Sequence, residues 1–314
     1  MAQFRILVTA PYMLPIIDDF ADRFAANDAE IVKADVEERM EEADLLPLMG
    51  DIDGVICGDD RFTAEVMDAA PRLKVIAKWG TGIDSIDSDA AQERNIAVCR
   101  TIDAFTEGVA DSVLGYMLCF ARNLVAMDRH MKGCVWEKIP GRALNETTIG
   151  VIGVGATGSA VLRRATAFGA RILGTDIRDV HPGHVTALGV EMTTLDELLA
   201  QSDFVSTNCD LNPTSEHLMS TAQFERMKAS AVFVNCARGP VVDEAALVAA
   251  LQAGSIAGAG LDVFEREPLP VDSPLRSMDN VLLAPHNSNS SPKAWQHIHQ
   301  STLDQLFAVL AEAT

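Results

Sequence analysis

The chain has 314 residues, and its 25 basic and 45 acidic side chains give a formal net charge of −20 at pH 7. A charge of this sign repels nucleic acids and anionic membranes, so neither is expected as a partner. The length allows one or two domains, each with a hydrophobic core of its own.

Short apolar runs alternate with helical patterns in the first hundred residues, an order that predicts a parallel α/β sheet. The candidate strands are Phe4–Thr9, Glu30–Ala34, Gly54–Cys57, Lys74–Ala77 and Ile96–Cys99. The first run ends at Pro11 and is too short for the core of a signal peptide, and no segment is expected to span a membrane. The charge run Asp35–Asp44 favours a solvent-exposed helix face over an interaction patch.

The stretch Thr106–Met131 predicts one long helix, with Thr106 as the N-cap and Gly133 as the stop signal. Its apolar side chains lie on more than one face: Val109, Val113, Leu114, Met117, Leu118, Phe120, Leu124 and Met127. Core packing alone is one explanation. We prefer a second one, in which this helix and the segment after it form a homodimer interface.

A second series of strands begins after residue 147. The candidates are Ile149–Val154, Arg171–Gly174, Val190–Met192, Phe204–Thr207, Val232–Asn235, Ala257–Leu261 and Val281–Ala284. The helical candidates are Leu195–Gln201, Thr221–Lys228, Glu244–Ala253 and Trp295–Ala311. Two such series predict two Rossmann-like lobes with a ligand cleft between them at the carboxyl ends of the strands. The expected domains are residues 1–100 plus 288–314, flavodoxin-like, and residues 101–287.

A glycine-rich turn follows the strand that starts the second series. Gly153 permits a tight turn, Gly155 lets the backbone approach a pyrophosphate, and Gly158 lets helix and strand pack closely. Asp176 lies 18 residues after Gly158 (176 − 158), close to the spacing expected of a carboxylate that holds a ribose hydroxyl. The pattern predicts NAD as the cofactor, because Asp176 repels a 2′-phosphate. The alternative that Arg178 binds such a 2′-phosphate remains open.

Three later motifs follow apolar runs, so their polar side chains are expected at strand ends: Asn235–Gly239, Leu261–Pro268 and Pro285-His286. Arg238 has a guanidinium fork suited to a carboxylate. His286 is a candidate acid or base, and Glu267 is a carboxylate able to raise the pKa of a histidine. Taken singly, each has an ordinary structural explanation as a salt bridge or a packed histidine. Together they indicate a catalytic site.

The six cysteines lie far apart and form no CxxC pair: Cys57, Cys99, Cys119, Cys134, Cys209 and Cys236. Their spacing predicts buried thiols in a reducing compartment, and neither a disulfide framework nor a metal site. The cytoplasm is the expected location.

Across nearly its full length the chain resembles the D-isomer-specific 2-hydroxyacid dehydrogenases, and within them the phosphoglycerate dehydrogenase and glyoxylate/hydroxypyruvate reductase branches. Besides the glycine turn, the matching stretches are Leu73–Asp87, Trp136 in KGCVWEK, Asn235–Leu247, Ala257–Pro268 and Asn280–His286. The resemblance implies hydride transfer between NAD(H) and a small D-2-hydroxy acid or 2-oxo acid, of the 3-phosphoglycerate, glyoxylate or hydroxypyruvate class.

The resemblance also implies roles for individual residues. Arg238 anchors the substrate, His286 donates or accepts the proton, and Glu267 is the partner of that histidine. The backbone amides around Thr81 and Gly82 hold the substrate carboxylate, within a substrate-binding turn made of Trp79, Gly80, Thr81 and Gly82. Further contacts to the cofactor are implied for Ala156, Thr157, Cys209, Cys236 and Asp262, the last of which orients the nicotinamide amide.

Three stretches depart from the family pattern. Ala156 stands where an arginine is common, so backbone amides are expected to hold the phosphates. Asp210–Asn212 replaces a usual Pro-Leu-Thr beside the adenine, and Asn287–Ser290 replaces small residues after the histidine. A phosphorylated substrate would need nearby cations, for which Lys78 and Arg100 are the candidates.

Two alternatives to a hydroxyacid dehydrogenase remain. One is a non-catalytic, NAD-sensing regulator on the same fold, although the chain shows no basic or low-complexity segment for a partner. The other is a phosphite or formate dehydrogenase. Formate-oxidising relatives carry a glutamine where this chain has Glu267, which suits a reaction with no proton to deliver, so Glu267 argues against formate.

Overall fold

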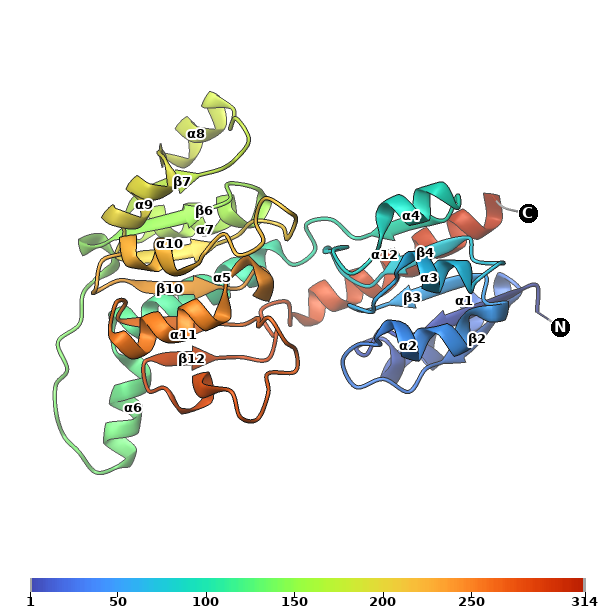
Figure 1. The fold of residues 1–314 in the computed structure, drawn as a ribbon, viewed down its shortest axis with the longest axis horizontal. Coiled ribbons are helices and arrows are strands. Elements are labelled where there is room, and N and C mark those ends of the chain that lie inside the picture. Colours follow the sequence, from blue (N-terminus) through green and yellow to red (C-terminus); the bar gives the residue numbers. More distant parts are fainter. Residues whose placement is uncertain (1, 313–314) are drawn as a thin grey trace. The chain divides into compact units, whose positions relative to one another are not determined.

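The computed structural model describes residues 2–312, which form two compact units (Figure 1). One unit comprises Met1–Ala104 with Ser291–Thr314, and the other comprises Phe105–Ser290. The boundaries expected from the sequence lie within four residues of these (104 − 100 and 291 − 288). Each unit has its own parallel sheet covered by helices, so the predicted fold class is confirmed.

The first unit contains a five-stranded parallel sheet in the order β2-β1-β3-β4-β5. The strands are β1 (Phe4–Val8), β2 (Ala29–Lys33), β3 (Gly54–Cys57), β4 (Val75–Lys78) and β5 (Ala97–Arg100). Each lies within one residue of its predicted bounds. Strands β3 and β4 are buried along their whole length, as expected for apolar runs in the middle of a parallel sheet. The strand order is that of flavodoxin-like folds.

Helices of the first unit pack on both faces of this sheet. They are α1 (Ala21–Ala26), α2 (Glu42–Leu45), α3 (Ala64–Asp68), α4 (Ser88–Glu93) and α12 (Pro292–Glu312), with 3₁₀ turns at Leu14–Phe20 and Leu46–Asp51. The C-terminal helix α12 packs on β3, β4 and β5 and buries Ile298, Leu303 and Leu306 there. The last helix of the chain therefore belongs to the N-terminal unit, which the sequence predicted.

The charge run Asp35–Asp44 does not form the predicted helix, since only α2 at its end is helical. The physical reason is a tertiary anchor inside the run. The Met40 side chain is buried, and its backbone N–H donates to the Asp60 carboxylate at 2.7 Å. An apolar residue fixed in this way holds the preceding residues in an irregular loop.

The second unit contains a seven-stranded parallel sheet in the order β12-β11-β10-β9-β6-β7-β8. The strands are β6 (Thr148–Ile152), β7 (Arg171–Thr175), β8 (Glu191–Met192), β9 (Phe204–Thr207), β10 (Val232–Asn235), β11 (Gly258–Leu261) and β12 (Val281–Leu283). All lie within two residues of their predicted bounds. The chain reverses its direction of winding between β6 and β9, which is the switch point where such sheets bind ligands.

Helices cover both faces of the seven-stranded sheet. They are α5 (Thr106–Ala121), α6 (Leu124–Lys132), α7 (Ala156–Ala167), α8 (Pro182–Leu188), α9 (Leu195–Gln201), α10 (Thr221–Arg226) and α11 (Glu244–Ala253), with 3₁₀ turns at Leu144–Glu146, Gly239–Val241 and Pro274–Ser277. One core lies under α9, α10 and α11, with Phe224 and Phe233 at its centre. The other lies under α5 and α7 and includes Met117 and Val161.

The prediction of a single long helix over Thr106–Met131 is wrong. The structure has two helices, α5 and α6, bent by 59° at a break after Ala121. Asn123 has a left-handed φ of 53° at the break, and its side-chain amide donates to the Pro140 carbonyl at 3.0 Å. Thr106 is the first helical residue, and Phe105 occupies the N-cap position. Because α6 points away from the sheet, its described residues are not buried (Figure 1).

Within residues 2–312, no single helix is both long and apolar enough to cross a membrane, and only the bent pair α5 and α6 meets that length and composition together.

Candidate active site

The glycine turn between β6 and α7 has the geometry of a phosphate-binding loop. Gly153 has a φ of +87°, and a side chain there would press on the backbone of Asn208. A side chain on Gly158 would overlap the carbonyl oxygen of Gly153. Gly155 is the N-cap residue of α7, and no side chain caps this helix end. The backbone N–H groups of Ala156 and Thr157 in the first turn are therefore left without a capping side chain. These features fit the pyrophosphate of a dinucleotide.

Asp176 follows β7 and lies beside this turn. Its Oδ2 atom accepts a hydrogen bond from the Val154 N–H at 2.8 Å, and its Oδ1 atom accepts from the Arg178 N–H at 2.9 Å and Nε at 3.2 Å. Burial by itself would raise the pKa of Asp176, but the hydrogen bonds from Arg178 and Val154 outweigh it and hold the pKa below its usual range. The carboxylate is therefore charged and lies against the backbone of the glycine turn.

Arg178 also reaches the phosphate turn. Its Nη2 atom lies 3.6 Å from the position that a Cβ on Gly155 would occupy. The side chain is 73% exposed although it is paired with Asp176. The alternative that Arg178 meets a phosphate of the cofactor thus has a geometric basis.

Three further residues assigned to the cofactor follow the central strands. Cys209 follows β9, Cys236 follows β10 and Asp262 follows β11. Burial raises the pKa of Cys209 to about 11, so it is a neutral thiol. Asp262 is buried, and its two carboxylate oxygens accept the backbone N–H groups of Asn287 and Ser288, each at 2.8 Å. Asp262 thus shapes the segment after His286, a role that the sequence did not indicate.

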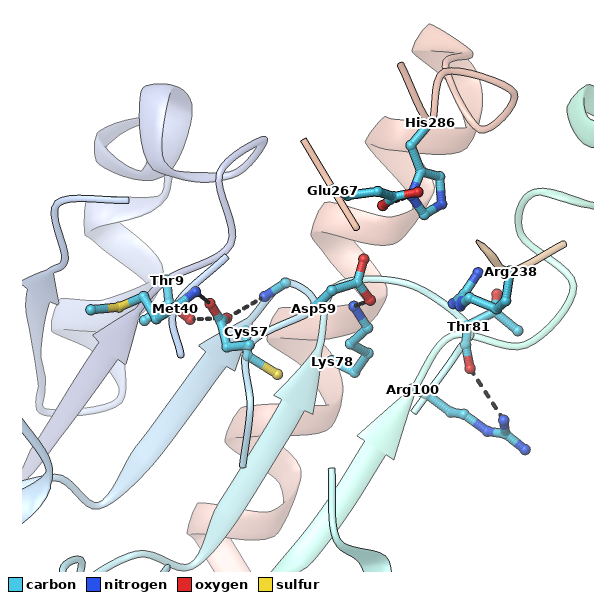
Figure 2. Close-up of polar contacts among 12 residues, drawn as sticks. Thr9, Met40, Cys57, Asp59, Lys78, Thr81, Arg100, Arg238, Glu267 and His286 are labelled. Carbon is cyan, nitrogen blue, oxygen red and sulfur yellow. Dashed lines mark hydrogen bonds and ion pairs between the residues drawn. The ribbon is translucent and has the colours of Figure 1, made fainter. Parts of the chain in front are cut away.

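The second unit brings His286 and Glu267 together. His286 follows β12, and its Nδ1 atom lies 3.0 Å from the Glu267 Oε2 atom (Figure 2). The other carboxylate oxygen accepts the Phe264 N–H at 2.9 Å. His286 has a left-handed φ of 50°, uncommon for a residue with a side chain, and its N–H donates to the Asp262 carbonyl at 2.7 Å. Backbone conformations of this kind cluster at functional sites.

Arg238 follows β10 in the same unit. A side chain on the next residue, Gly239, would overlap the backbone of Phe264 and Glu265. The segment that carries Arg238 is therefore in direct backbone contact with the loop that carries Glu267. Buried Asn235 shapes this segment, because its side chain donates to the Arg238 carbonyl at 2.9 Å and accepts the Ala237 N–H at 3.0 Å.

The residues proposed to hold the substrate carboxylate lie in the first unit, directly after β4. Gly80 has a φ of +141°. Trp79 is buried, and its Nε1 atom donates to His299 at 2.9 Å. Thr81 donates from its hydroxyl to the Thr101 carbonyl at 2.8 Å and accepts from Arg100 Nη1 at 3.1 Å through its own carbonyl (Figure 2). Gly82 completes this turn, whose shape is fixed by side chains from β5 and α12.

Both cations considered for a phosphorylated substrate already have partners. Lys78 is 3% exposed, and its Nζ atom lies 2.7 Å from Asp59 Oδ1 (Figure 2). The Arg100 guanidinium donates to the Thr81 carbonyl. Lys78 in particular is neutralised by a carboxylate, so it is a poor phosphate ligand.

The cysteines are less uniform than the sequence predicted. Cys57 and Cys236 are buried, Cys99, Cys119 and Cys209 are half-buried, and Cys134 is exposed. Cys134 departs from the prediction because it lies directly after α6, none of whose residues is buried. In the described part of the chain, His, Cys, Asp and Glu side chains form no group of three that could hold a metal ion.

Comparisons with known proteins converge on one family. A family model described as "D-isomer specific 2-hydroxyacid dehydrogenase, NAD binding domain" matches residues 114–288. Glyoxylate reductase from Thermofilum pendens is 40% identical over 274 residues, which cover 85% of this chain and 81% of that protein. D-3-phosphoglycerate dehydrogenase from Methanocaldococcus jannaschii is 36% identical over 313 residues, 98% of this chain and 57% of that protein.

A solved structure supports the same conclusion. The NADPH-dependent glyoxylate/hydroxypyruvate reductase from Sinorhizobium meliloti, in complex with NADP and malonate, matches with a TM-score of 0.82 and 31% sequence identity. The match covers 98% of this chain and 93% of that one. The similarity thus extends over both units.

Proposed function

The chain belongs to the D-isomer-specific 2-hydroxyacid dehydrogenase family, and we propose on this basis that it reduces a small 2-oxo acid to a D-2-hydroxy acid. It is an NAD(P)-dependent oxidoreductase of hydroxy acids. The observation that carries the chemistry of the proposal is the contact of 3.0 Å between His286 Nδ1 and Glu267 Oε2. A histidine held in this way can deliver a proton to a carbonyl oxygen that becomes a hydroxyl.

Arg238, Glu267 and His286 have separate roles in this proposal. Arg238 binds the substrate carboxylate and polarises the carbonyl group. Glu267 fixes the ring of His286 through Nδ1, so that Nε2 carries the proton that is delivered, and its charge favours the protonated imidazole. The bound dinucleotide supplies the hydride. A glutamate at this position suits a reaction that needs a proton, which favours 2-oxo acids over formate.

The first unit contributes the carboxylate-binding turn in this proposal. Backbone N–H groups of Gly80, Thr81 and Gly82 would donate to the substrate carboxylate, whereas the Trp79 N–H already donates to the Cys57 carbonyl at 2.8 Å. The support is the tight turn after β4, which Thr101, Arg100 and His299 hold in place.

We propose NAD as the preferred cofactor. The support is the charged Asp176 carboxylate beside the turn, which accepts ribose hydroxyls and repels a 2′-phosphate. Among the relatives, the Sinorhizobium meliloti reductase is NADPH-dependent, and a comparison of rates with NADH and NADPH tests the preference of this chain.

We also propose a homodimer and a cytoplasmic location. The dimer is supported by exposed apolar side chains on α6 and the segment after it: Leu124, Val125, Met131, Val135 and Trp136. Trp136 is 85% exposed, which is unusual for so large an apolar side chain. The location is supported by six cysteines that are all unpaired.

A substrate panel tests the proposed function. The rate of NADH oxidation would be measured with glyoxylate, hydroxypyruvate, pyruvate and 3-phosphohydroxypyruvate, and then with NADPH in place of NADH. We expect turnover with glyoxylate or hydroxypyruvate, and a lower kcat/KM with the phosphorylated acid because Lys78 is neutralised by Asp59. Absence of turnover on every 2-oxo acid, at saturating cofactor, would overturn the proposal.

A further inference from the structure

We propose that Glu265 is a positioning residue that holds Glu267 against His286. Glu265 does so because it is fixed between His217 and the start of α11, next to the segment that carries Arg238. The kinetic part of this inference rests on the proposed function. Glu265, His217 and Glu244 form a cluster in the second unit that we call the clamp. It forms a second glutamate–histidine pair, two residues along the chain from Glu267.

Glu265 is held through both its side chain and its backbone. Its Oε1 atom lies 2.8 Å from His217 Nε2 and accepts the Glu244 N–H at 3.3 Å. In return, the Glu265 N–H donates to Glu244 Oε2 at 3.1 Å. A proton on His217 Nε2 makes the imidazole a donor to Glu265, whether the ring is neutral or charged. Three hydrogen bonds thus fix one residue of a surface loop.

His217 itself is tied to the segment that carries the substrate anchor. Its N–H donates to the Pro240 carbonyl at 2.8 Å, and the Met219 N–H donates to the Val241 carbonyl at 3.1 Å. Pro240 and Val241 follow Arg238 after one residue, Gly239. The clamp therefore joins the segments that follow β9, β10 and β11, the last two of which carry Arg238 and Glu267.

The coupling from the clamp to Glu267 is short. Phe264, whose N–H donates to Glu267 Oε1, directly precedes Glu265. Gly239 leaves no room between its own backbone and that of Phe264 and Glu265. Any displacement of Glu265 must therefore shift the donor that orients the Glu267 carboxylate, and with it the contact to His286.

Charge supports the same coupling. Burial raises the pKa of Glu244; the hydrogen bond from Glu265 lowers it in part, and the charges of Glu265 and Glu267 raise it further. The charged and titratable groups brought together here are the carboxylates of Glu244, Glu265 and Glu267 and the imidazoles of His217 and His286. Three carboxylates thus lie close to the contact between Glu267 and His286, so a displacement of Glu265 also changes the charge around that contact.

Substitutions at Glu265 test the inference, with two independent readouts. Glu265→Ala removes the acceptor, whereas Glu265→Gln keeps an oxygen that can accept from His217 and from the Glu244 N–H. The readouts are the pH dependence of kcat and KM for reduction, and the NMR titration of His286 in the protein without substrate, its signal assigned with His286→Gln. Glu216→Ala is the matched control, because Glu216 is an exposed neighbour of His217 outside the clamp.

In Glu265→Ala we expect kcat to fall about tenfold and the NMR midpoint of His286 to move to lower pH by about half a unit or more, with NADH affinity unchanged. In Glu265→Gln we expect kcat within about threefold of the wild type, since the hydrogen bonds persist. His217→Ala should move both readouts in the same direction as Glu265→Ala, and the Glu216→Ala control should move neither.

Three results would overturn the inference: an unmoved midpoint and pH profile in Glu265→Ala, a parallel loss of NADH affinity, or a Glu265→Gln variant as impaired as Glu265→Ala. If the wild type reduces no 2-oxo acid, the proposed function fails, while the NMR titration of His286 still decides the inference.

Discussion

At the scale of single residues, the proposed proton chemistry depends on Glu267 and His286. Because Glu267 contacts His286 Nδ1, Glu267→Gln removes a charge that favours the protonated imidazole. Reduction requires that protonated form, so the pH above which kcat/KM declines should move toward acid by about one unit. The measurement is the pH profile of kcat/KM for NADH oxidation, from rates at varied and subsaturating 2-oxo acid with saturating NADH. An unmoved profile would mean that the carboxylate is structural.

Arg238→Gln should raise KM for the 2-oxo acid and also lower kcat, because the guanidinium serves binding and carbonyl polarisation together. NADH affinity should stay close to that of the wild type, since the nucleotide turn lies elsewhere in the unit. Steady-state kinetics at varied oxo acid, with a fluorescence titration of NADH as the control, checks this. A change in kcat alone would contradict the role as substrate anchor.

Asp176→Ala should weaken NADH binding about tenfold or more, because charged hydrogen bonds to the ribose are lost. It should also narrow the preference for NADH over NADPH, because a repulsive charge is removed while Arg178 remains. Fluorescence titration with both cofactors measures this. If the wild type already binds NADPH more tightly, Arg178 governs the choice and the NAD preference is wrong.

The sequence could indicate Arg238, Glu267 and His286 because each follows an apolar run that predicts a strand ending at the ligand edge. It could not indicate the clamp. His217 and Glu265 are 48 residues apart, and their meeting depends on how three loops fold over one another. Asn235 and Gly239 belong to a recognised motif, but their roles become visible only through the backbone contact with Phe264.

At the scale of elements, Asp203 joins the start of β9 to β6. Its carboxylate accepts the Thr148 N–H at 2.9 Å and contacts Arg142 at 2.9 Å and Lys228 at 3.3 Å. Burial alone would raise the pKa of Asp203, but the Thr148 and Arg142 hydrogen bonds and the Lys228 charge hold it below its usual range. Because the pKa of Asp203 is lower in the folded than in the unfolded protein, its charge stabilises the fold at pH values above the unfolded-state pKa. This stabilisation is lost as the pH falls through the folded-state pKa.

Asp203→Asn should therefore lower the free energy of unfolding by about 1–3 kcal/mol at pH 7, and the deficit should shrink as the pH falls below about 4. Urea denaturation of both proteins at several pH values measures this. A deficit that stays constant down to pH 3 would contradict the electrostatic explanation.

Strands were predictable because short apolar runs between polar turns have few other solutions in an α/β protein. The break between α5 and α6 was not, because neither glycine nor proline marks it. Asn123 takes the left-handed conformation there, and the Pro140 carbonyl that it bonds lies 17 residues away. The prediction of a helix over Asp35–Asp44 was wrong for a similar reason, since the carboxylate of the distant Asp60 holds the backbone of Met40.

At the scale of the whole molecule, the exposed apolar side chains of α6 and the segment after it are the basis of the proposed homodimer. Trp136→Glu should convert the proposed homodimer into a monomer, or weaken it about tenfold or more, because a charge would enter an apolar interface. Light scattering with size-exclusion chromatography measures the mass. Val271→Glu is the control, since Val271 is 92% exposed on a different loop. A wild type that is monomeric at micromolar concentration would contradict the proposal.

The two-unit organisation followed from two series of strands in the sequence, and the return of the last helix to the first unit followed from its apolar face. What the sequence could not supply is the set of side chains that shape the loops at the strand ends.

The central claim is that His286 is the proton donor in the reduction of a 2-oxo acid. The most direct test is the kcat of NADH oxidation in His286→Ala, with the exposed His297→Ala as the matched control and the NADH dissociation constant measured in both. We predict a fall in kcat of about 10²–10⁴-fold in His286→Ala, an unchanged dissociation constant, and a control that behaves as the wild type. Near-full turnover of His286→Ala on every 2-oxo acid that the wild type reduces would contradict the mechanism.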